Sequence, residues 1–495
     1  MSKIIIQNGN MCELDLPLKF AQKLYNEFAI RHPNAFYLRT RQRGMQNWDG
    51  KIHYITKTGQ FKIGLLPKVY DMCIEMGIKP KVVDMRQPLP KVSKVVTNIG
   101  KYKLRPEQEK AVKAVINNKI GNTPFHIGVL DYTVNAGKTL IMSSLYLSYK
   151  KQLKTLLITN DSDWLNQARE EFKQYLPGED ITFVQGKVLN WSNFTIGMVQ
   201  SISRNMRFYQ KELSQIDMVL VDEADQGGSK QYQNVITRLF NTRIRIGLSG
   251  TIYMSKLAKD RVKNMNLECF FGKVLAEFKL KDSIKKGYST KTVVKMVPGK
   301  PWYGNWESDC ISYKEIYDDS ITENNTAWTM AYNRLRWNIN QGRYPALVVC
   351  KHIAHCENLY KFFKKKLGDA YNIAYVHVNT PSKLRQQIMR DFREGKIDIL
   401  VSTTIIARGK NFPKLRYLLN AASMDSQEKS IQFLGRLVRT DKSKKKVYLD
   451  DLHYPGNYLD RHGKHRKQYY QRQELKVILL DKLWKKHPNH SLIKS

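Results

Sequence analysis

The sequence predicts an α/β fold with two tandem parallel-sheet lobes, preceded by a small α+β domain. Residues 96–285 and 341–450 alternate short apolar segments with amphipathic ones, which is typical of parallel strands joined by helices. The chain has 495 residues, too many for one hydrophobic core. We therefore expect a small domain over 1–95, a first lobe over 96–285, a connector over 286–340, a second lobe over 341–450 and a basic, aromatic tail over 451–495.

Both lobes contain short apolar runs of strand length. The strands predicted for the first lobe are Phe125–Leu130, Thr155–Thr159, Ile181–Gln185, Thr195–Gln200, Met218–Val221 and Ile244–Ser249. The strands predicted for the second lobe are Ala346–Cys350, Ile373–Val378, Ile397–Ser402, Tyr417–Asn420 and Val447–Asp450.

The first 95 residues have a different pattern. Residues 16–30 have helical periodicity, and Ala35–Arg41 is expected to be a strand. Residues 51–56 and 60–65 alternate with period two around a short turn, which predicts a hairpin, and residues 67–77 predict a closing helix. An α-β-β-β-α order is common among small nucleic-acid-binding domains.

Residues 134–139 read Val-Asn-Ala-Gly-Lys-Thr and follow a predicted strand. Backbone N–H groups of such a turn can wrap a phosphate, with Lys138 on the β- and γ-phosphates and Thr139 on Mg²⁺. Taken alone, a Gly-Lys-Thr sequence is more often the basic first turn of an ordinary helix.

A second motif decides between these interpretations. Residues 221–225 read Val-Asp-Glu-Ala-Asp and also follow a predicted strand. Asp222 can hold the same metal ion, and Glu223 can orient a water molecule. The two motifs together predict an ATPase with ATP and Mg²⁺ as cofactors.

The charge balance predicts a polyanionic partner. Lys and Arg total 83 against 44 for Asp and Glu, so the formal net charge is 83 − 44 = +39, and it is spread along the chain. Nucleic acid is the commonest polyanion. An anionic membrane is the weaker alternative, because no basic amphipathic helix stands out and no apolar run is long enough to span a bilayer. Without a signal-peptide core, and with six scattered Cys, a cytoplasmic protein is expected.

One Cys/His cluster, residues 350–356, has spacing that could bind zinc. Because Cys350 ends an apolar run and a helical pattern follows, the side chains would point in different directions. We favour a strand-to-helix turn.

Two groups of basic residues carry further predictions. Arg436 and Arg439 lie three residues apart in a helical segment of the second lobe and could reach a γ-phosphate, where arginine fingers contribute several kcal/mol. In the small domain, basic residues lie beside a Trp, which favours nucleic-acid contact over a solvated turn next to a core Trp. These residues are Arg39, Arg41, Arg43 and Trp48.

The order of the motifs from about residue 96 to 450 resembles superfamily 2 helicases. The small first domain and the form of the phosphate loop are similar to the phage UvsW-type branch-migration helicases, relatives of the XPB and RecG translocases. The resemblance implies two RecA-like lobes. The motifs are residues 104–108, 134–139, 222–225, 247–251, 402–411 and 432–439.

The resemblance also implies roles for single residues. Nucleotide contacts would come from Arg105, Gln108, Asn135, Ala136, Gly137, Lys138, Thr139, Gly409 and Asn411, with Gln108 on the adenine edge. Gln432, Arg436 and Arg439 would complete the γ-phosphate site, while Ser249 and Thr251 would couple ATP to nucleic-acid movement. Nucleic-acid backbone contacts would come from Thr159, Asn160, Gln200, Ser201, Thr403 and Thr404.

Three positions depart from the family pattern. Tyr132 stands where a small residue usually opens the phosphate loop, and Asn135 stands where Gly is frequent. Asn tolerates left-handed backbone angles, so the turn remains feasible. Asn411 replaces a common Asp, so a hydrogen-bonding group remains at the ribose position but its charge is lost.

We interpret the chain as an ATP-dependent DNA helicase or translocase of branched DNA, including forks, D-loops, R-loops and Holliday junctions, in recombination, repair or replication restart. Its partner would be branched or partly single-stranded DNA, with RNA in hybrids allowed, in the host cytoplasm if a phage encodes it. An RNA helicase and a non-hydrolysing DNA-binding scaffold are the alternatives.

Overall fold

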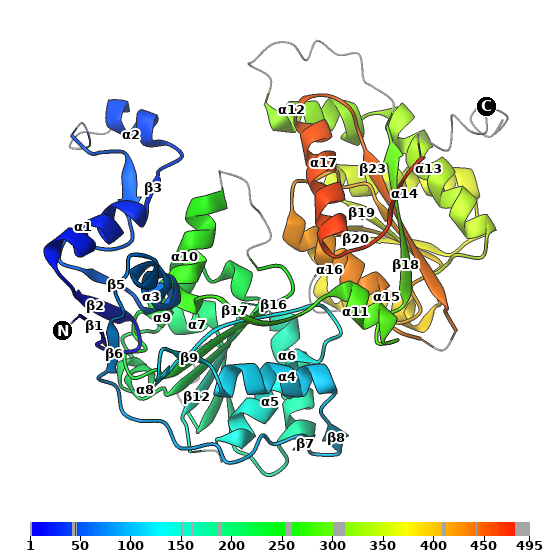
Figure 1. The fold of residues 1–495 in the computed structure, drawn as a ribbon. Helices are drawn as coiled ribbons and strands as arrows, with labels where there is room; N and C mark the ends of the chain where they lie inside the picture. Colours follow the sequence, from blue (N-terminus) through cyan, green and yellow to red (C-terminus); the bar gives the residue numbers. More distant parts are fainter. Residues whose placement is uncertain are drawn as a thin grey trace. The chain divides into compact units, whose positions relative to one another are not determined.

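The computed structural model describes residues 2–41, 45, 47–149, 152–160, 162–186, 191–252, 260–299, 312–407, 412–441 and 443–480 (Figure 1). The chain divides into two compact units, Met1–Phe278 and Lys279–Ser495. Each unit is built around a seven-stranded parallel sheet, so the predicted α/β fold with two tandem RecA-like lobes is confirmed.

The sheet of unit 1 has the strand order β13-β14-β12-β15-β16-β11-β17. Its central strands are buried along their whole length, which explains why they are apolar runs rather than alternating ones. All six strands predicted here are confirmed; the edge strand β17, which carries exposed residues, was not predicted. The bounds are β11 (His126–Tyr132), β12 (Thr155–Thr159), β13 (Ile181–Val184), β14 (Phe194–Met198), β15 (Met218–Asp222), β16 (Ile244–Ser249) and β17 (Val274–Phe278).

Helices join these strands. They are α4 (Pro106–Ile116), α5 (Lys138–Ser148), α6 (Ser162–Tyr175), α7 (Val199–Arg204), α8 (Gln210–Ser214), α9 (Lys230–Ile236) and α10 (Arg261–Phe271). Two short ribbons lie before β11, formed by β7 (Asn98–Ile99) with β8 (Tyr102–Lys103) and by β9 (Lys119–Ile120) with β10 (Thr123–Pro124).

The sheet of unit 2 has the strand order β20-β21-β19-β22-β23-β18-β24. The five predicted strands are confirmed, and two more complete the sheet. The bounds are β18 (Lys291–Pro298), β19 (Ala346–Cys350), β20 (Ile373–Val376), β21 (Ile399–Thr403), β22 (Tyr417–Asn420), β23 (Lys446–His453) and β24 (Val477–Leu479). The helices are α11 (Leu280–Lys285), α12 (Tyr313–Tyr317), α13 (Asn325–Asn340), α14 (Ile353–Leu367), α15 (Ser382–Glu394), α16 (Gln427–Leu437) and α17 (Asn457–Arg472).

Two segments assigned outside the second lobe belong to its fold. Residues 286–340 contain β18, which pairs with both β23 and β24, and α13, which contributes to the hydrophobic core. Residues 451–480 contain α17 and β24. The prediction of a connector and a tail is therefore wrong for these elements. β18 escapes recognition because Lys291 and Lys295 interrupt its apolar pattern.

The small domain has a four-stranded sheet in the order β5-β2-β1-β6 and a two-stranded ribbon, β3 with β4. The ribbon carries α2, which is a helix where a strand was predicted over the same residues. The predicted hairpin is confirmed only next to its turn, where Ile55 and Phe61 form an antiparallel bridge; beyond the turn, β4 pairs with β3 and β5 pairs with β2. The bounds are β1 (Lys3–Ile6), β2 (Met11–Asp15), α1 (Leu18–Glu27), β3 (Ala29–Arg31), α2 (Ala35–Arg41), β4 (Lys51–His53), β5 (Gln60–Lys62), α3 (Leu66–Glu75) and β6 (Lys81–Asp84).

The small domain shares one hydrophobic core with the first sheet. Arg245 on β16 is fully buried, and its Nη2 donates to Gly9 O (2.6 Å) and Asn10 Oδ1 (2.8 Å). Burial lowers the pKa of Arg245 to about 9. Gly64 packs so tightly on α10 that a Cβ atom there would lie 2.1 Å from Glu268 O. Residues 1–95 are thus fastened onto the first lobe.

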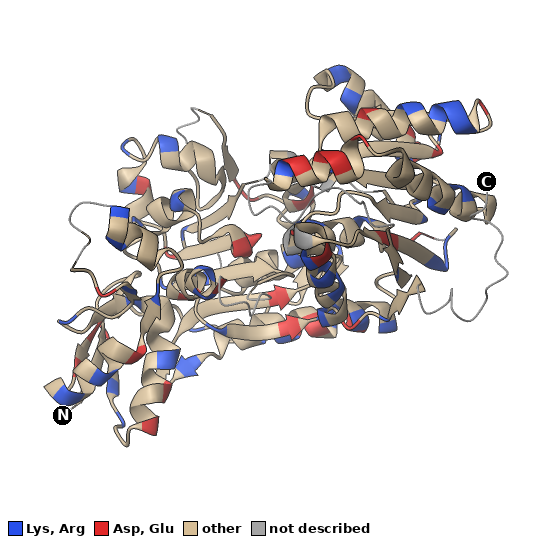
Figure 2. Ribbon diagram, turned by 90° about the horizontal axis from the view of Figure 1, so that it is seen from above, with Lys and Arg blue, Asp and Glu red and all other residues tan. Residues whose placement is uncertain are grey.

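Lys and Arg occur on the ribbons of both units, in line with a charge spread along the chain (Figure 2). In the described parts of the chain, no helix combines the length and apolar character needed to cross a bilayer.

Candidate functional site

The phosphate loop lies between β11 and α5, at the carboxyl end of a fully buried strand. Asn135 has φ 64° and Gly137 has φ 71°, so two residues of the turn are left-handed. Asn tolerates this conformation, which accounts for the departure from Gly at position 135. Lys138 and Thr139 begin α5, where unpaired N–H groups and the helix dipole favour a phosphate.

Tyr132 does not enter this loop. Its ring is fully buried, and its hydroxyl donates to Glu107 O of α4 over 2.7 Å. The large residue at the start of the motif is therefore accommodated by the core.

Gln108 is bound to the loop from the side of α4. Its Nε2 donates to Ala136 O (2.8 Å), while its Oε1 accepts from the N–H of Arg105 (2.8 Å). Arg105 Nη1 donates to Asn135 O over 3.3 Å. These contacts bring the predicted nucleotide residues of the first lobe together, with Gln108 fastened to the loop backbone.

Lys138 faces the acidic motif. Its Nζ lies 3.6 Å from Asp222 Oδ1, and both side chains are largely buried. Burial lowers the pKa of Lys138, but the carboxylates of the motif outweigh that effect, so the pKa stands above its ordinary value. Lys138 is therefore a fixed cation at this end of the sheet.

Asp222 ends β15 and has the features of a metal-binding carboxylate. Burial raises the pKa of Asp222 above its usual range, although Lys138 opposes this. Its Oδ1 is buried and accepts no hydrogen bond. A buried carboxylate oxygen without a donor fits a Mg²⁺ ion, which is bound through one or two carboxylates together with substrate phosphates.

Glu223 follows in a left-handed conformation with φ 52° and ψ 51°. Such a conformation costs a non-Gly residue roughly 1–2 kcal/mol. Strain of this kind clusters at functional sites.

A buried hydroxyl network connects the next strand to the acidic motif. Ser249 ends β16, and its Oγ donates to Asp225 Oδ1 over 2.8 Å. The same Oγ lies 3.0 Å from Thr251 Oγ1 and accepts from Thr251 N–H (3.1 Å). Of the two residues predicted to couple ATP to movement, Ser249 therefore contacts the acidic motif and Thr251 contacts Ser249. Asp225 was not among the predicted site residues, although it is the last residue of the predicted acidic motif.

The residues predicted to contact nucleic acid in unit 1 also lie at the carboxyl ends of strands. Thr159 ends β12 and is buried, and Asn160 donates from Nδ2 to Gln226 Oε1. Gln200 Nε2 donates to Asn160 O over 3.4 Å. Ser201 Oγ instead accepts from Gly186 N–H.

Unit 2 holds the remaining motif residues. Thr403 ends β21 and is buried, and Thr404 Oγ1 accepts from Lys429 Nζ over 3.2 Å. Gln432 and Arg436 lie on α16, which ends at Leu437. Arg439 lies two residues beyond, so the prediction of one shared helix is wrong for this pair. Gly409, Asn411 and Arg43 lie outside the described residues.

The Cys/His segment forms the predicted strand-to-helix turn. β19 ends at Cys350 and α14 begins at Ile353. His355 is buried and its Nδ1 lies 3.1 Å from the hydroxyl of Tyr317.

Two family models match the chain in the order of its two sheets. The first, "Type III restriction enzyme, res subunit", covers residues 101–254, and "Helicase conserved C-terminal domain" covers residues 331–441. The chain belongs to the superfamily 2 helicases.

Relatives of this superfamily 2 helicase act on different nucleic acids. The ATP-dependent DNA helicase uvsW of Enterobacteria phage T4 is 21% identical, over 88% of this chain and 90% of its own. Two further curated relatives, both helicases, are matched over 64% and 51% of their own length.

Two solved structures share the fold. The Type ISP restriction-modification enzyme LlaBIII bound to DNA has a TM-score of 0.59 and 15% identity, over 83% of this chain and 34% of that one. Saccharomyces cerevisiae Dbp5 bound to RNA has a TM-score of 0.51 and 14% identity, over 79% and 94%.

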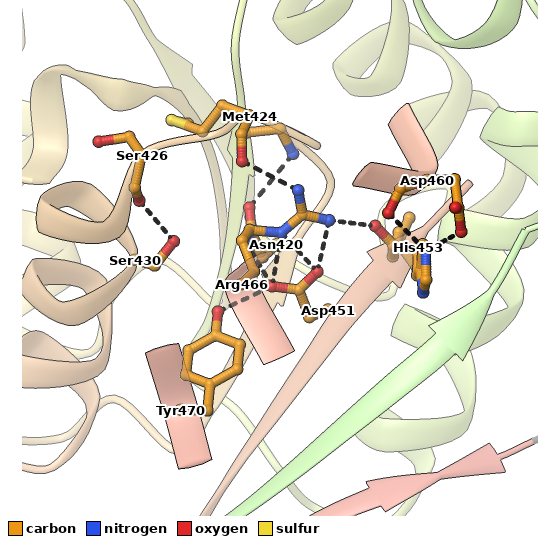
Figure 3. A network of polar contacts seen from close by, with 11 residues as sticks. Asn420, Met424, Ser426, Ser430, Asp451, His453, Asp460, Arg466 and Tyr470 are labelled. Atoms are coloured by element: carbon orange, nitrogen blue, oxygen red, sulfur yellow. Dashed lines mark hydrogen bonds and ion pairs between the residues drawn. The ribbon is translucent and has the colours of Figure 1, made fainter. Parts of the chain in front are cut away.

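In this helicase, a buried polar network joins α17 to the segment before α16 (Figure 3). Arg466 of α17 is fully buried and pairs with Asp451 of β23 at 2.9 Å. Its Nη1 also donates to Met424 O, two residues before the N-cap Ser426 of α16. Asn420 and Tyr470 donate to the same Asp451 carboxylate. No sequence motif marks this network before α16, the helix that carries Arg436, and it was not predicted.

The small domain of the helicase presents a basic and aromatic helix. In α2, Phe36 and Tyr37 are 79% and 55% exposed, and Arg41 stacks on Tyr37 at 4.9 Å. Trp48 is half-buried, donates from Nε1 to Lys51 O and meets His32 edge-on. The exposed aromatic side chains are therefore those of α2, which the sequence interpretation overlooked by predicting a strand.

Proposed function

We propose that this helicase is an ATP-driven motor that unwinds or branch-migrates branched or partly single-stranded DNA. The observation that carries the ATPase activity is the arrangement of Lys138, Asp222 and Glu223 at the carboxyl ends of β11 and β15, where Asp222 is buried and the other two residues are half-buried. It combines a cation, a buried carboxylate 3.6 Å from that cation and a second carboxylate on a residue with left-handed backbone angles.

Each of these groups has one task in phosphoryl transfer. Lys138 and the N–H groups at the start of α5 bind the β- and γ-phosphates. Thr139 and Asp222 would hold Mg²⁺, which neutralises charge on the phosphates when bound. Glu223 orients the attacking water and takes up its proton.

The arginines of unit 2 would act on the same nucleotide when the units close. Arg436 and Arg439 follow the family order, and an added cation at the γ-phosphate stabilises the charge of the transition state. When the units open after hydrolysis, the protein would move forward along one nucleic-acid strand. Ser249 and Thr251 would transmit the change, since Ser249 contacts the acidic motif directly and Thr251 contacts Ser249.

The preference for branched DNA rests on α2 and on the relative from phage T4. Exposed rings beside Arg39 and Arg41 suit stacking on unpaired bases and contact with phosphates. The T4 relative is named a DNA helicase, and its match covers 88% of this chain.

The deciding experiment compares ATP hydrolysis without nucleic acid and with single-stranded DNA, duplex DNA, a four-way junction and RNA. We expect the largest stimulation from the junction and from single-stranded DNA. Stronger stimulation by RNA would favour an RNA helicase. Binding without hydrolysis under any condition would indicate a scaffold.

A substitution in α2 tests its role in choosing the substrate. Deleting residues 1–95 would expose the shared core and Arg245, so point changes are needed. Phe36→Ala with Tyr37→Ala should lower junction unwinding several-fold and leave basal hydrolysis unchanged. Leu18→Ala is the matched control, because Leu18 is 78% exposed in α1 of the same domain. Equal unwinding by both variants would remove α2 from substrate choice.

A further inference from the structure

A second group of basic and aromatic side chains lies in unit 2, on β18, β23 and the end of α13. Three cations surround Trp337 of α13: Lys295 at 4.7 Å, Arg343 at 4.7 Å and Arg334 at 5.1 Å from its ring centroid. Arg343 also stacks on Tyr448 of β23 at 3.7 Å. We call these five residues, with Lys291 and Lys446, the Trp337 cluster.

The sheet register explains why these residues gather. In the parallel pairing of β18 with β23, Lys291 lies opposite Lys446, Val293 opposite Tyr448 and Lys295 opposite Asp450. Alternate residues of a strand share one face, so all of these side chains are on the same face of the sheet. Lys291 and Lys446 are exposed there, and Tyr448 is half-buried.

The two exposed lysines of the cluster lie at the opposite end of the sheet from Thr403. Lys291 and Lys446 are the first residues of their strands, whereas Thr403 is the last residue of β21. Because all strands of this sheet are parallel, their first residues lie at one end of the sheet and their last residues at the other. A contact at these lysines would therefore be separate from a contact at Thr403 and Thr404.

The positive charge of the cluster is poorly neutralised by the protein itself. Asp450 forms an ion pair with Arg334, whose Nη2 lies 2.6 Å from Asp450 Oδ2. The same oxygen accepts hydrogen bonds from Asn338 and Tyr417. Burial lowers the pKa of Lys295; Asp450 opposes this effect, and the neighbouring cations Arg334, Arg343 and Lys446 add to it. Like charges held together in this way favour binding of an external anion.

The aromatic rings hold the cations in place. Cation–π contacts contribute about 0.5–1 kcal/mol each at exposed sites. Arg343 is fixed further by donating from Nη1 to Asn338 Oδ1 over 2.9 Å. The rings are already covered by cations, so the cluster offers ordered positive charge rather than a stacking platform for bases.

We propose that the Trp337 cluster is a second nucleic-acid contact that binds the phosphate backbone without regard to sequence. This inference rests on the proposed function, which brings a nucleic-acid strand to this chain. Cations on two adjacent strands and on the end of α13 attract phosphates, and each neutralised phosphate releases a counterion. The contact would hold a strand of the substrate while the motifs step along another part of it.

The test is the triple substitution Lys295→Gln, Arg343→Gln and Lys446→Gln in the full chain. Its matched control is Lys364→Gln, Lys365→Gln and Lys366→Gln, which removes the same charge from the exposed end of α14 in the same unit. Binding of a fluorescent single-stranded DNA is measured by anisotropy over a range of salt. With about 0.7 released counterions per contact, the slope of log K against log salt should become shallower by about 2 in the cluster variant alone.

Several results would overturn the inference. Equal slopes in the cluster and control variants would mean that only net charge matters. A loss of binding to phosphatidylglycerol vesicles, with DNA binding unchanged, would assign the cluster to a membrane surface. Lys446→Gln alone, at an exposed position, guards against misfolding and should make the slope shallower by about 0.7. Wild-type protein without nucleic-acid-stimulated hydrolysis would refute the proposed function instead, whatever the slopes.

Discussion

Ser249 Oγ donates a hydrogen bond to Asp225 Oδ1 over 2.8 Å and so joins the end of β16 to the turn after β15. Both side chains are buried. A movement of Asp225 would therefore displace Ser249, which in turn contacts Thr251.

Ser249→Ala should uncouple hydrolysis from strand separation. The change leaves Asp225 without this donor in a buried position, which costs about 1–3 kcal/mol. We expect hydrolysis to fall a few-fold and unwinding per ATP to fall further, measured on the same junction. Thr251→Ser, which keeps a hydroxyl, is the control. Equal losses in both activities would show that the bond only supports the fold.

Glu223→Gln should abolish turnover and leave ATP binding intact. The amide keeps the shape of the side chain but cannot accept the proton of water, so hydrolysis should fall by about 10²–10⁴. Lys138→Ala should weaken ATP binding as well, because it removes the fixed cation. Single-turnover hydrolysis and nucleotide binding, measured separately, check both outcomes. Near-normal hydrolysis by the Glu223→Gln protein would remove Glu223 from the mechanism.

The parts of the fold that sequence predicts are those with local causes. β12, β16, β19 and β22 are continuous apolar runs because both faces of the sheet are covered, and their bounds match the predicted ones. β18 was missed since its lysines face an incompletely covered part of the sheet. Likewise, Ala35–Arg41 forms a helix between β3 and β4, which pair with each other although they are separated in sequence.

The site divides in the same way. The phosphate loop and acidic motif are contiguous in sequence, so their residues could be named in advance. The contacts of Gln108 with the loop and of Arg466 with Met424 join residues 28 and 42 positions apart. No local pattern predicts such a contact, because it depends on how the helices pack.

Arg439→Ala should reduce stimulated hydrolysis much more than nucleotide affinity. The segment carrying Arg439 is tied to the start of the second sheet, since Thr290 Oγ1 donates to Arg439 O over 3.1 Å. An arginine that acts on the transition state lowers kcat when removed, whereas one that only binds ground-state ATP raises KM. Steady-state kinetics with saturating DNA distinguish the two, with Arg439→Lys as the control. A rise in KM without loss of kcat would contradict the proposed role.

His355 should make unit 2 sensitive to acid. Burial lowers the pKa of His355 to about 3, against an ordinary value of 6.5. The unfolded chain therefore binds one more proton between these values, and the free energy of unfolding falls as pH drops below 6.5, by up to about 1.4 kcal/mol per pH unit. His355→Asn, which cannot titrate, should flatten this dependence in urea unfolding followed from pH 7 to 4. An unchanged slope would mean that His355 does not remain neutral in the folded protein.

Arg466 should set the position of α16, the helix that carries Arg436. Its guanidinium connects Asp451 of β23 with Met424 O before α16, and it is fully buried. Removing one partner of a buried ion pair typically costs about 3–5 kcal/mol, so Arg466→Met should lower the melting temperature of unit 2. Arg466→Lys keeps the charge but loses the planar set of donors. We expect the Lys variant to fold with a lower kcat and an almost unchanged KM for ATP, because α16 would be displaced while the first lobe still binds nucleotide. Lys464→Gln, on the exposed side of the same helix, is the control and should leave both constants unchanged. If the Lys variant lost thermal stability with a normal kcat, Arg466 would hold the core of unit 2 without setting the position of Arg436.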